Sequence, residues 1–339
     1  MVRVLVAAVI AMLIAIILGP RFIAFLRRNA FGQHIREDGP EHHVVKQGTP
    51  VMGGVLIMIA ASVGFLAMSR YTLPALTVFG VTLACATIGF VDDFIKLTHR
   101  RSLGLSGRWK LLLLAGVTVG LGFAVHDEHF RTNVYFPIVD VRPNLWWFWY
   151  LLIFLMLAGA ANGVNLTDGI DGLAAGTGII ALVCFTAINV LTYIRTGSGD
   201  PNSLDLAILG GALAGASIGF LWFNAFPAEV FMGDTGSMGI GGALGAFAVF
   251  SKTEVLLLVV GGIFLIEALS VILQVATFKF WGRRVFLMAP IHHHFEMKAW
   301  SETKIMVRFW IVAAILAAGA FATYYQYFFD FHPELFHKK

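Results

Sequence analysis

Leu73-Pro-Ala-Leu-Thr-Val-Phe-Gly-Val-Thr-Leu-Ala-Cys-Ala-Thr-Ile-Gly-Phe-Val91, followed at once by Asp92-Asp93, is the stretch that decides the fold. The apolar segment contains no charge and is long enough to cross a bilayer, since a spanning helix needs about 20 apolar residues. The two aspartates lie where this helix meets water. Adjacent carboxylates repel, so both stay ionised at neutral pH only where a cation neutralises them. The stretch therefore predicts a membrane helix that ends in a charged site.

Apolar segments of this kind recur along the whole chain. Of its 339 residues, 58% are hydrophobic and 13% charged, with a mean hydropathy of +0.80, which excludes a water-soluble globular protein. Candidate spans lie at 4–26, 52–69, 73–91, 110–126, 145–163, 172–194, 206–223, 238–250, 255–277 and 305–327. The sequence thus predicts an all-α polytopic membrane protein of about ten transmembrane helices, with residues 1–339 forming a single integral membrane domain.

The distribution of basic residues predicts the orientation. An even number of spans places both termini on one side, and the loops on the opposite side hold 14 Lys and Arg against 8. By the positive-inside rule the richer side is cytoplasmic, so both termini lie outside. The same rule accounts for the net charge of +4 without a nucleic acid partner. The loops that concentrate His, Asp, Lys and Gly all fall on the cytoplasmic side, which predicts one shared site there.

Asn165-Leu-Thr-Asp168-Gly-Ile-Asp171-Gly172 gathers polar groups at the edge of a predicted span. An aspartate at a helix N-terminus is commonly a cap that accepts from free backbone amides. Capping explains one aspartate but not the second together with Asn165 and Thr167. We interpret the segment as a ligand-binding motif.

Phe231-Met-Gly-Asp234-Thr-Gly-Ser237 places a carboxylate between glycines and hydroxyls just before another span. Backbone amides in such a turn can approach a phosphate while the aspartate binds a metal ion. An ordinary turn with a helix cap is an equally good interpretation of this motif alone. Phe231 could stack on a base, although aromatic residues at membrane interfaces are more often anchors.

Two further loops combine histidine, lysine and glycine. Pro290-Ile-His292-His293-His294-Phe-Glu296 lies among basic residues, and histidine hydrogen bonds to phosphate or proton transfer fit these surroundings better than zinc, which usually takes spaced ligands. Lys46-Gln-Gly-Thr49-Pro leads into a Gly-Gly turn without the order of a P-loop. The glycines there suit phosphate binding and close helix packing equally well.

Glu267 lies in the middle of the predicted span 255–277, where a charge costs about 2.5–3.5 kcal/mol. Ser270 and Gln274 fall on the same helical face, so we interpret Glu267 as an internal polar contact, with a proton pathway as the alternative. Cys85 and Cys184 lie inside apolar segments and are interpreted as small hydrophobic residues. Carboxylates, cations and glycine turns on one face together favour phosphoryl transfer, which needs mainly positioning and charge neutralisation.

These motifs resemble those of the polyprenyl-phosphate N-acetylhexosamine-1-phosphate transferase superfamily. The resemblance covers the chain from end to end and rests on Asp92-Asp93, on Asn165 to Gly169 and on Met232 to Asp234. Lys46-Gln-Gly-Thr-Pro and Pro290-Ile-His-His-His-Phe-Glu296 resemble one branch, the phospho-N-acetylmuramoyl-pentapeptide transferases (the MraY or translocase I family).

The resemblance implies a multi-pass enzyme of the bacterial plasma (inner) membrane whose active site faces the cytoplasm. It implies Mg²⁺-dependent transfer of phospho-MurNAc-pentapeptide from UDP-MurNAc-pentapeptide to undecaprenyl phosphate, giving lipid I and UMP for peptidoglycan synthesis, and a possible homodimer. The implied catalytic residues are Asp92, Asp93, Asp234 and His293, with Asp234 as the metal ligand. The implied substrate-binding residues are Lys46, Thr49, Lys96, Asn165, Asp168, Asp171, Asn224, Phe231, His292 and His294.

Two positions depart from the pattern, and two other functions remain open. Val51 stands where the family usually has Thr, and Ala299 where Gly is common. A sister enzyme that transfers another N-acetylhexosamine phosphate would use the same metal chemistry, but the His292–Glu296 motif argues against it. An ion-coupled transporter would use Glu267 and broken helices, yet the acidic groups lie at one face rather than at the midplane.

Overall fold

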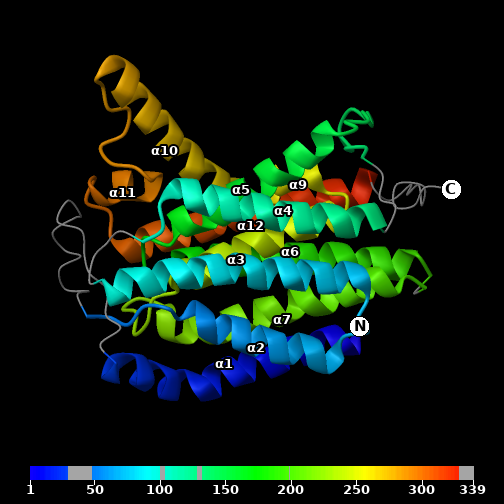
Figure 1. Ribbon diagram of the computed structural model, residues 1–339, viewed down its shortest axis with the longest axis horizontal. Coiled ribbons are helices and arrows are strands. Elements are labelled where there is room, and N and C mark those ends of the chain that lie inside the picture. The colour runs from blue at the N-terminus through cyan, green and yellow to red at the C-terminus, as the bar shows by residue number, and fades with distance from the viewer. Residues whose placement is uncertain (30–47, 100–103, 128–131, 198, 328–339) are drawn as a thin grey trace.

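The computed structural model describes residues 1–29, 48–99, 104–127, 132–197 and 199–327, and within them the chain forms helices and no sheet (Figure 1). The helices are α1 (Val2–Arg28), α2 (Gly54–Met68), α3 (Leu73–Thr98), α4 (Gly107–Asp127), α5 (Phe148–Thr167), α6 (Leu173–Arg195), α7 (Pro201–Asn224), α8 (Gly233–Phe250), α9 (Glu254–Val260), α10 (Gly262–Trp281), α11 (Ile291–Glu296) and α12 (Glu302–Tyr327). This confirms the predicted all-α polytopic membrane fold.

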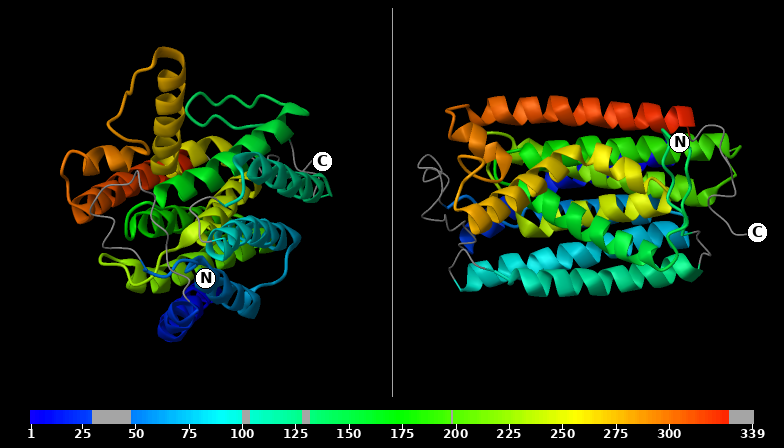
Figure 2. Two further views of the ribbon diagram at one scale, coloured as in Figure 1. Left: turned by 60° about the vertical axis from the view of Figure 1, so that its left-hand side comes forward. Right: turned by 90° about the horizontal axis from the view of Figure 1, so that it is seen from above.

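Most of these helices run side by side along the length of one bundle (Figure 2). In the described part of the chain, 8 helices are long and apolar enough to cross a membrane, namely α1, α3, α4, α5, α6, α7, α10 and α12. α2 is shorter, with 15 residues. The predicted total of ten spans and the predicted orientation therefore remain predictions.

α8 is the central helix, and its glycines explain how the neighbouring backbones reach it. Every residue from Asp234 to Phe250 is buried. A Cβ added at Gly241 would lie 2.4 Å from the carbonyl oxygen of Ala160 in α5, and one added at Gly89 in α3 would lie 2.0 Å from that of Asp234. Small residues at these positions let the helices touch backbone to backbone. The end of α3 is thereby held directly against the start of α8.

The single span predicted at 255–277 is wrong, because the structure divides it into α9 and α10. α9 ends at Val260 and α10 begins at Gly262, so the Gly261-Gly262 pair interrupts the helix. α10 then leaves the bundle at an angle (Figures 1 and 2), and its buried residues extend only as far as Ser270. Gln274 secures the following loop, since its Oε1 accepts from the backbone N–H groups of Val285 and Phe286 at 3.0 Å each.

Candidate active site

Three buried carboxylates, Asp92, Asp93 and Asp234, meet where the end of α3 packs on the start of α8, and we call them the carboxylate centre. Each offers one oxygen that lies within 4.8 Å of an oxygen from each of the other two. Asp93 accepts from the backbone N–H groups of Asp234 at 3.1 Å and of Thr235 at 2.9 Å, and from the Thr235 hydroxyl at 2.7 Å. Asp93 therefore caps α8 from α3 and fixes Asp234 beside the aspartate pair.

Two ammonium groups lie against these carboxylates. The Lys96 Nζ is 2.6 Å from Asp92 Oδ2 and 2.9 Å from Asp234 Oδ1, while the Lys110 Nζ is 2.6 Å from Asp234 Oδ2 and 3.1 Å from Asp92 Oδ1. Both cations favour the ionised form of Asp234. With all five groups ionised, one negative charge remains.

Lys110 is a site residue that the sequence interpretation missed. It lies in the first turn of α4, and it reaches the carboxylate centre only because α4 folds back along α3. In the sequence it is simply the last basic residue before an apolar segment, as expected for a lysine at a membrane edge. The connection before α4 also covers Asp92, since the Leu105 N–H donates to Asp92 Oδ1 at 2.7 Å. A Cβ at Gly104 would lie 2.4 Å from that oxygen, so any side chain there would displace the Asp92 carboxylate.

The carboxylate centre fits the chemistry of a magnesium ion. Mg²⁺ takes hard oxygen ligands, usually one or two carboxylates together with substrate phosphates and water. Three buried carboxylates with one excess negative charge provide such oxygens and call for a further cation. Asp234 offers one oxygen to each lysine. Its own N–H donates to Asp93, and the N–H of Gly233 before it donates to Asp168, so Asp234 lies next to both aspartates.

The loop between α5 and α6 is tied to the segment from the end of α7 to the start of α8 by Asp168, Asp171 and Asn224. Asp168 Oδ2 accepts from the Gly233 N–H at 3.0 Å, and Asp171 Oδ2 accepts from the Ala228 N–H at 2.9 Å. Asn224 Oδ1 accepts from the Gly172 N–H at 3.2 Å. Burial and the nearby negative charge of Asp234 raise the pKa of Asp168 to about 7, although the Gly233 N–H opposes the shift. Asp168, Asp171 and Asn224 thus lie together next to the carboxylate centre.

The structure describes three more of the predicted binding residues, namely Asn165, Phe231 and Thr49. Asn165 Nδ2 donates to Ser237 Oγ in α8 at 3.0 Å. Phe231 is half-buried, and its N–H donates to the Pro50 carbonyl at 2.8 Å, next to the half-buried Thr49. Lys46 lies outside the described residues.

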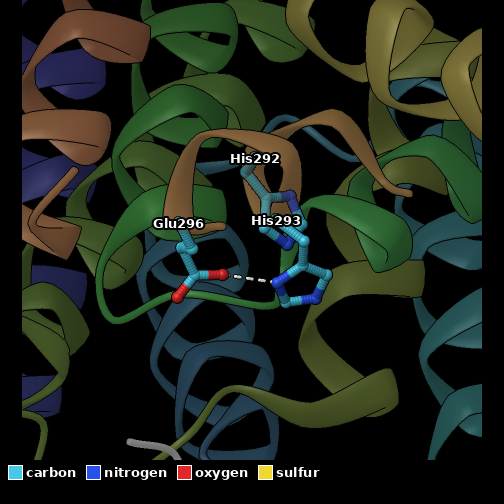
Figure 3. A group of neighbouring side chains, drawn as sticks. All are labelled: His292, His293 and Glu296. Atoms are coloured by element: carbon cyan, nitrogen blue, oxygen red, sulfur yellow. Dashed lines mark hydrogen bonds and ion pairs between the residues drawn. The ribbon is translucent and has the colours of Figure 1, made fainter. Parts of the chain in front are cut away.

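The three histidines of α11 have three different environments. His293 Nδ1 pairs with a carboxylate oxygen of Glu296 (Figure 3), whereas His294 Nδ1 accepts from the Leu287 N–H at 3.1 Å. Partial burial and the Lys298 charge lower the pKa of His294. His292 is fully buried, with its Nδ1 3.0 Å from Glu267 Oε1, which confirms the internal polar contact predicted for Glu267. The predicted substrate contacts of all three histidines remain predictions.

The loop after α11 holds Ala299, one of the two departures from the family pattern, in a conformation that favours glycine. Ala299 has a φ of 58°, in the left-handed region that favours glycine. The glycine common at this position in the family would adopt this conformation without strain.

Comparison with known proteins defines the class of this membrane protein and then the particular family. A model of glycosyl transferase family 4 matches residues 75–252, which is more than half of the chain. The chain is 46% identical to the phospho-N-acetylmuramoyl-pentapeptide-transferase of Rubrobacter xylanophilus, over 97% of this chain and 99% of the relative. The corresponding protein of Halalkalibacterium halodurans is 44% identical over 92% and 95%, and that of Desulfotalea psychrophila 46% identical over 94% and 91%. The chain belongs to the family of phospho-N-acetylmuramoyl-pentapeptide transferases.

Proposed function

We propose that this chain transfers phospho-MurNAc-pentapeptide from UDP-MurNAc-pentapeptide to undecaprenyl phosphate, giving lipid I and UMP. The observation that carries this proposal is the carboxylate centre with its two lysines, in a chain related over nearly its whole length to enzymes named for this transfer. The reaction belongs to the plasma membrane, with the site facing the cytoplasm. A homodimer is the assembly that the family resemblance favours.

In this reaction an oxygen of the lipid phosphate forms a bond to the phosphorus that carries the sugar, and the bond from that phosphorus to UMP breaks. A phosphate monoester has a second pKa near 6 and is largely dianionic at neutral pH, so the attack needs no strong base. Asp92 would therefore organise the lipid phosphate through the cations beside it rather than deprotonate it, and Asp93, whose oxygens cap α8, would be its partner. The Lys96 and Lys110 ammonium groups would offset the charge that develops on the departing UMP.

Asp234, with Asp92 and Asp93 beside it, would hold Mg²⁺. The ion supplies Lewis-acid stabilisation of phosphoryl oxygens when it is bound. Asp168, Asp171, Asn224 and Phe231 would hold the nucleotide sugar, and His293 would contact its phosphates.

The test is UMP release by purified protein with both substrates, with and without Mg²⁺. We expect release that stops in EDTA and returns when Mg²⁺ is restored. Asp234→Asn and Asp92→Asn should each abolish release while the protein stays folded. Turnover of UDP-GlcNAc but not of UDP-MurNAc-pentapeptide would instead establish the sister transferase, and substrate flux into liposomes without UMP release would establish a transporter.

A further inference from the structure

Glu267 and His292 form a fully buried pair at the point where α10 leaves the bundle. Both side chains are 0% exposed, and Glu267 Oε1 is 3.0 Å from His292 Nδ1. A buried polar group without a partner is destabilising, so this contact stabilises both side chains in their buried positions. The pair therefore joins α10 to α11, the helix that carries all three histidines.

The pairing also determines which ring atom of His292 faces Gly169, in the loop between α5 and α6. Because a carboxylate oxygen accepts, the hydrogen of this bond lies on Nδ1 of His292. The other nitrogen, Nε2, is buried and makes no hydrogen bond within the described residues. It lies against Gly169, where an added Cβ would be only 2.3 Å from Nε2. The His292 ring is therefore packed between the Glu267 carboxyl group and the backbone of Gly169.

The contact between His292 and Gly169 adjoins the candidate active site through two neighbouring residues, Asp168 and His293. On one side, Asp168 precedes Gly169 and accepts from the N–H of Gly233, the residue before Asp234. On the other side, the ring of His293 packs against that of His292 with centroids 4.1 Å apart (Figure 3). A shift of His292 would displace both Asp168 and His293.

We propose that Glu267 is a positioning residue: by holding His292 against Gly169, it keeps Asp168 and His293 in place for the nucleotide-sugar substrate. Glu267 itself contacts no substrate in this scheme. The inference rests on the proposed function, because it assigns Asp168 and His293 to that substrate. It predicts an effect on the nucleotide sugar that the lipid substrate does not share.

Glu267→Leu and Glu267→Gln form the central pair of variants. Leu has a similar size but no acceptor, whereas Gln keeps an acceptor oxygen for His292 Nδ1. Loss of a residue that orients a metal ligand typically costs about 10–100-fold, and we expect a loss of the same order for Glu267, which orients His292. We expect Glu267→Leu to weaken the Kd for UDP-MurNAc-pentapeptide, measured by calorimetry without lipid, by about tenfold or more, and Glu267→Gln to retain most of the affinity. The KM for undecaprenyl phosphate should stay within about twofold in both variants.

A double-mutant cycle tests the contact with Gly169. Gly169→Ala should weaken nucleotide-sugar binding strongly when His292 is present, and much less in a His292→Ala background, where the added methyl group has room. Melting temperatures in detergent confirm that the variants are folded.

The results separate this inference from the proposed function. An unchanged nucleotide-sugar Kd in Glu267→Leu, equal changes for both substrates, or equal effects of Gly169→Ala in the two backgrounds would each overturn the positioning role. Failure of the wild-type protein to release UMP would overturn the proposed function, whereas the Kd comparison and the cycle still decide the role of Glu267.

Discussion

The net charge of the carboxylate centre depends on single residues. Asp92, Asp93 and Asp234 are buried within a few ångströms of one another, and such carboxylates stay ionised together only with cations close by. Lys96 and Lys110 each contact both Asp92 and Asp234. Each lysine therefore acts on two carboxylates at once, and removal of either one leaves two negative charges in excess.

We expect Lys110→Ala to lower kcat for UMP release by about 100-fold, because loss of one preorganised charge at a phosphoryl-transfer site has effects of this size. Arg108→Ala is the matched control. Arg108 is exposed in the same turn of α4, and its removal should change kcat by less than about twofold. Steady-state assays with both substrates measure the difference. Equal effects of the two substitutions would show that Lys110 contributes only general surface charge.

The sequence was sufficient to predict the carboxylates of this site because each lies in a compact motif at the edge of a span. Lys110 could not be predicted, since its role depends on the packing of α4 against α3. The burial of His292 could not be predicted either. Three consecutive histidines must point in different directions, but only the tertiary structure shows that His292 faces Glu267.

At the level of helices, the contact between α3 and α8 brings Asp92 and Asp93 to Asp234. Gly89→Ala would place a methyl group 2.0 Å from the Asp234 carbonyl oxygen, a backbone atom that cannot move without displacing α8. We expect a loss of about 1–3 kcal/mol of stability and a fall in kcat on the order of tenfold or more. Gly80→Ala, in the same helix with nothing within 4 Å, should retain full activity and be neutral or slightly stabilising. Assays of UMP release and melting temperature on both variants check this, and a fully active Gly89→Ala would contradict it.

The opposite end of α3 is held by a carboxylate from α7. Asp205 is fully buried and accepts from the Ser69 hydroxyl at 2.9 Å and from the backbone N–H groups of Arg70 at 2.7 Å and Thr72 at 2.9 Å. Asp205→Ala leaves these donors unpaired, so we expect a loss of about 3 kcal/mol, seen as a lower melting temperature in detergent. Asp200→Ala, which removes the cap of α7 itself, should cost about 1 kcal/mol.

Both aspartates lie far from the carboxylate centre, at the other end of a helix of 26 residues. UMP release per folded molecule should therefore be unchanged in both variants. A fall in kcat without a fall in melting temperature would contradict a purely structural role for Asp205.

The break between α9 and α10 shows a limit of sequence interpretation at this level. Hydropathy predicted one continuous span because the residues on both sides of Gly261 are apolar. Hydropathy records only that a segment avoids water, and both a continuous helix and two helices at an angle satisfy this condition. Only packing against neighbouring helices decides between them.

For the whole molecule, the orientation in the membrane is the prediction that remains to be tested. α1 begins and α12 ends at the same end of the bundle, while α11 lies at the other end (Figure 1), as expected for an even number of crossings. The positive-inside rule places the end with α11 in the cytoplasm. Two exposed positions report the two sides: Ser106 just before α4, and Val139, which is 65% exposed, between α4 and α5.

We expect Ser106→Cys to react with a membrane-impermeant maleimide only in inside-out vesicles, and Val139→Cys only in right-side-out vesicles. The native Cys85 and Cys184 provide a low background, because both thiols are buried and inaccessible to the reagent. Labelling after solubilisation in detergent shows that both introduced thiols are reactive. If the two cysteines reacted from the same side, an even number of crossings would separate them, and α4 would not span the membrane as predicted. If each reacted from the opposite side, the site would face outward and the predicted orientation would be wrong.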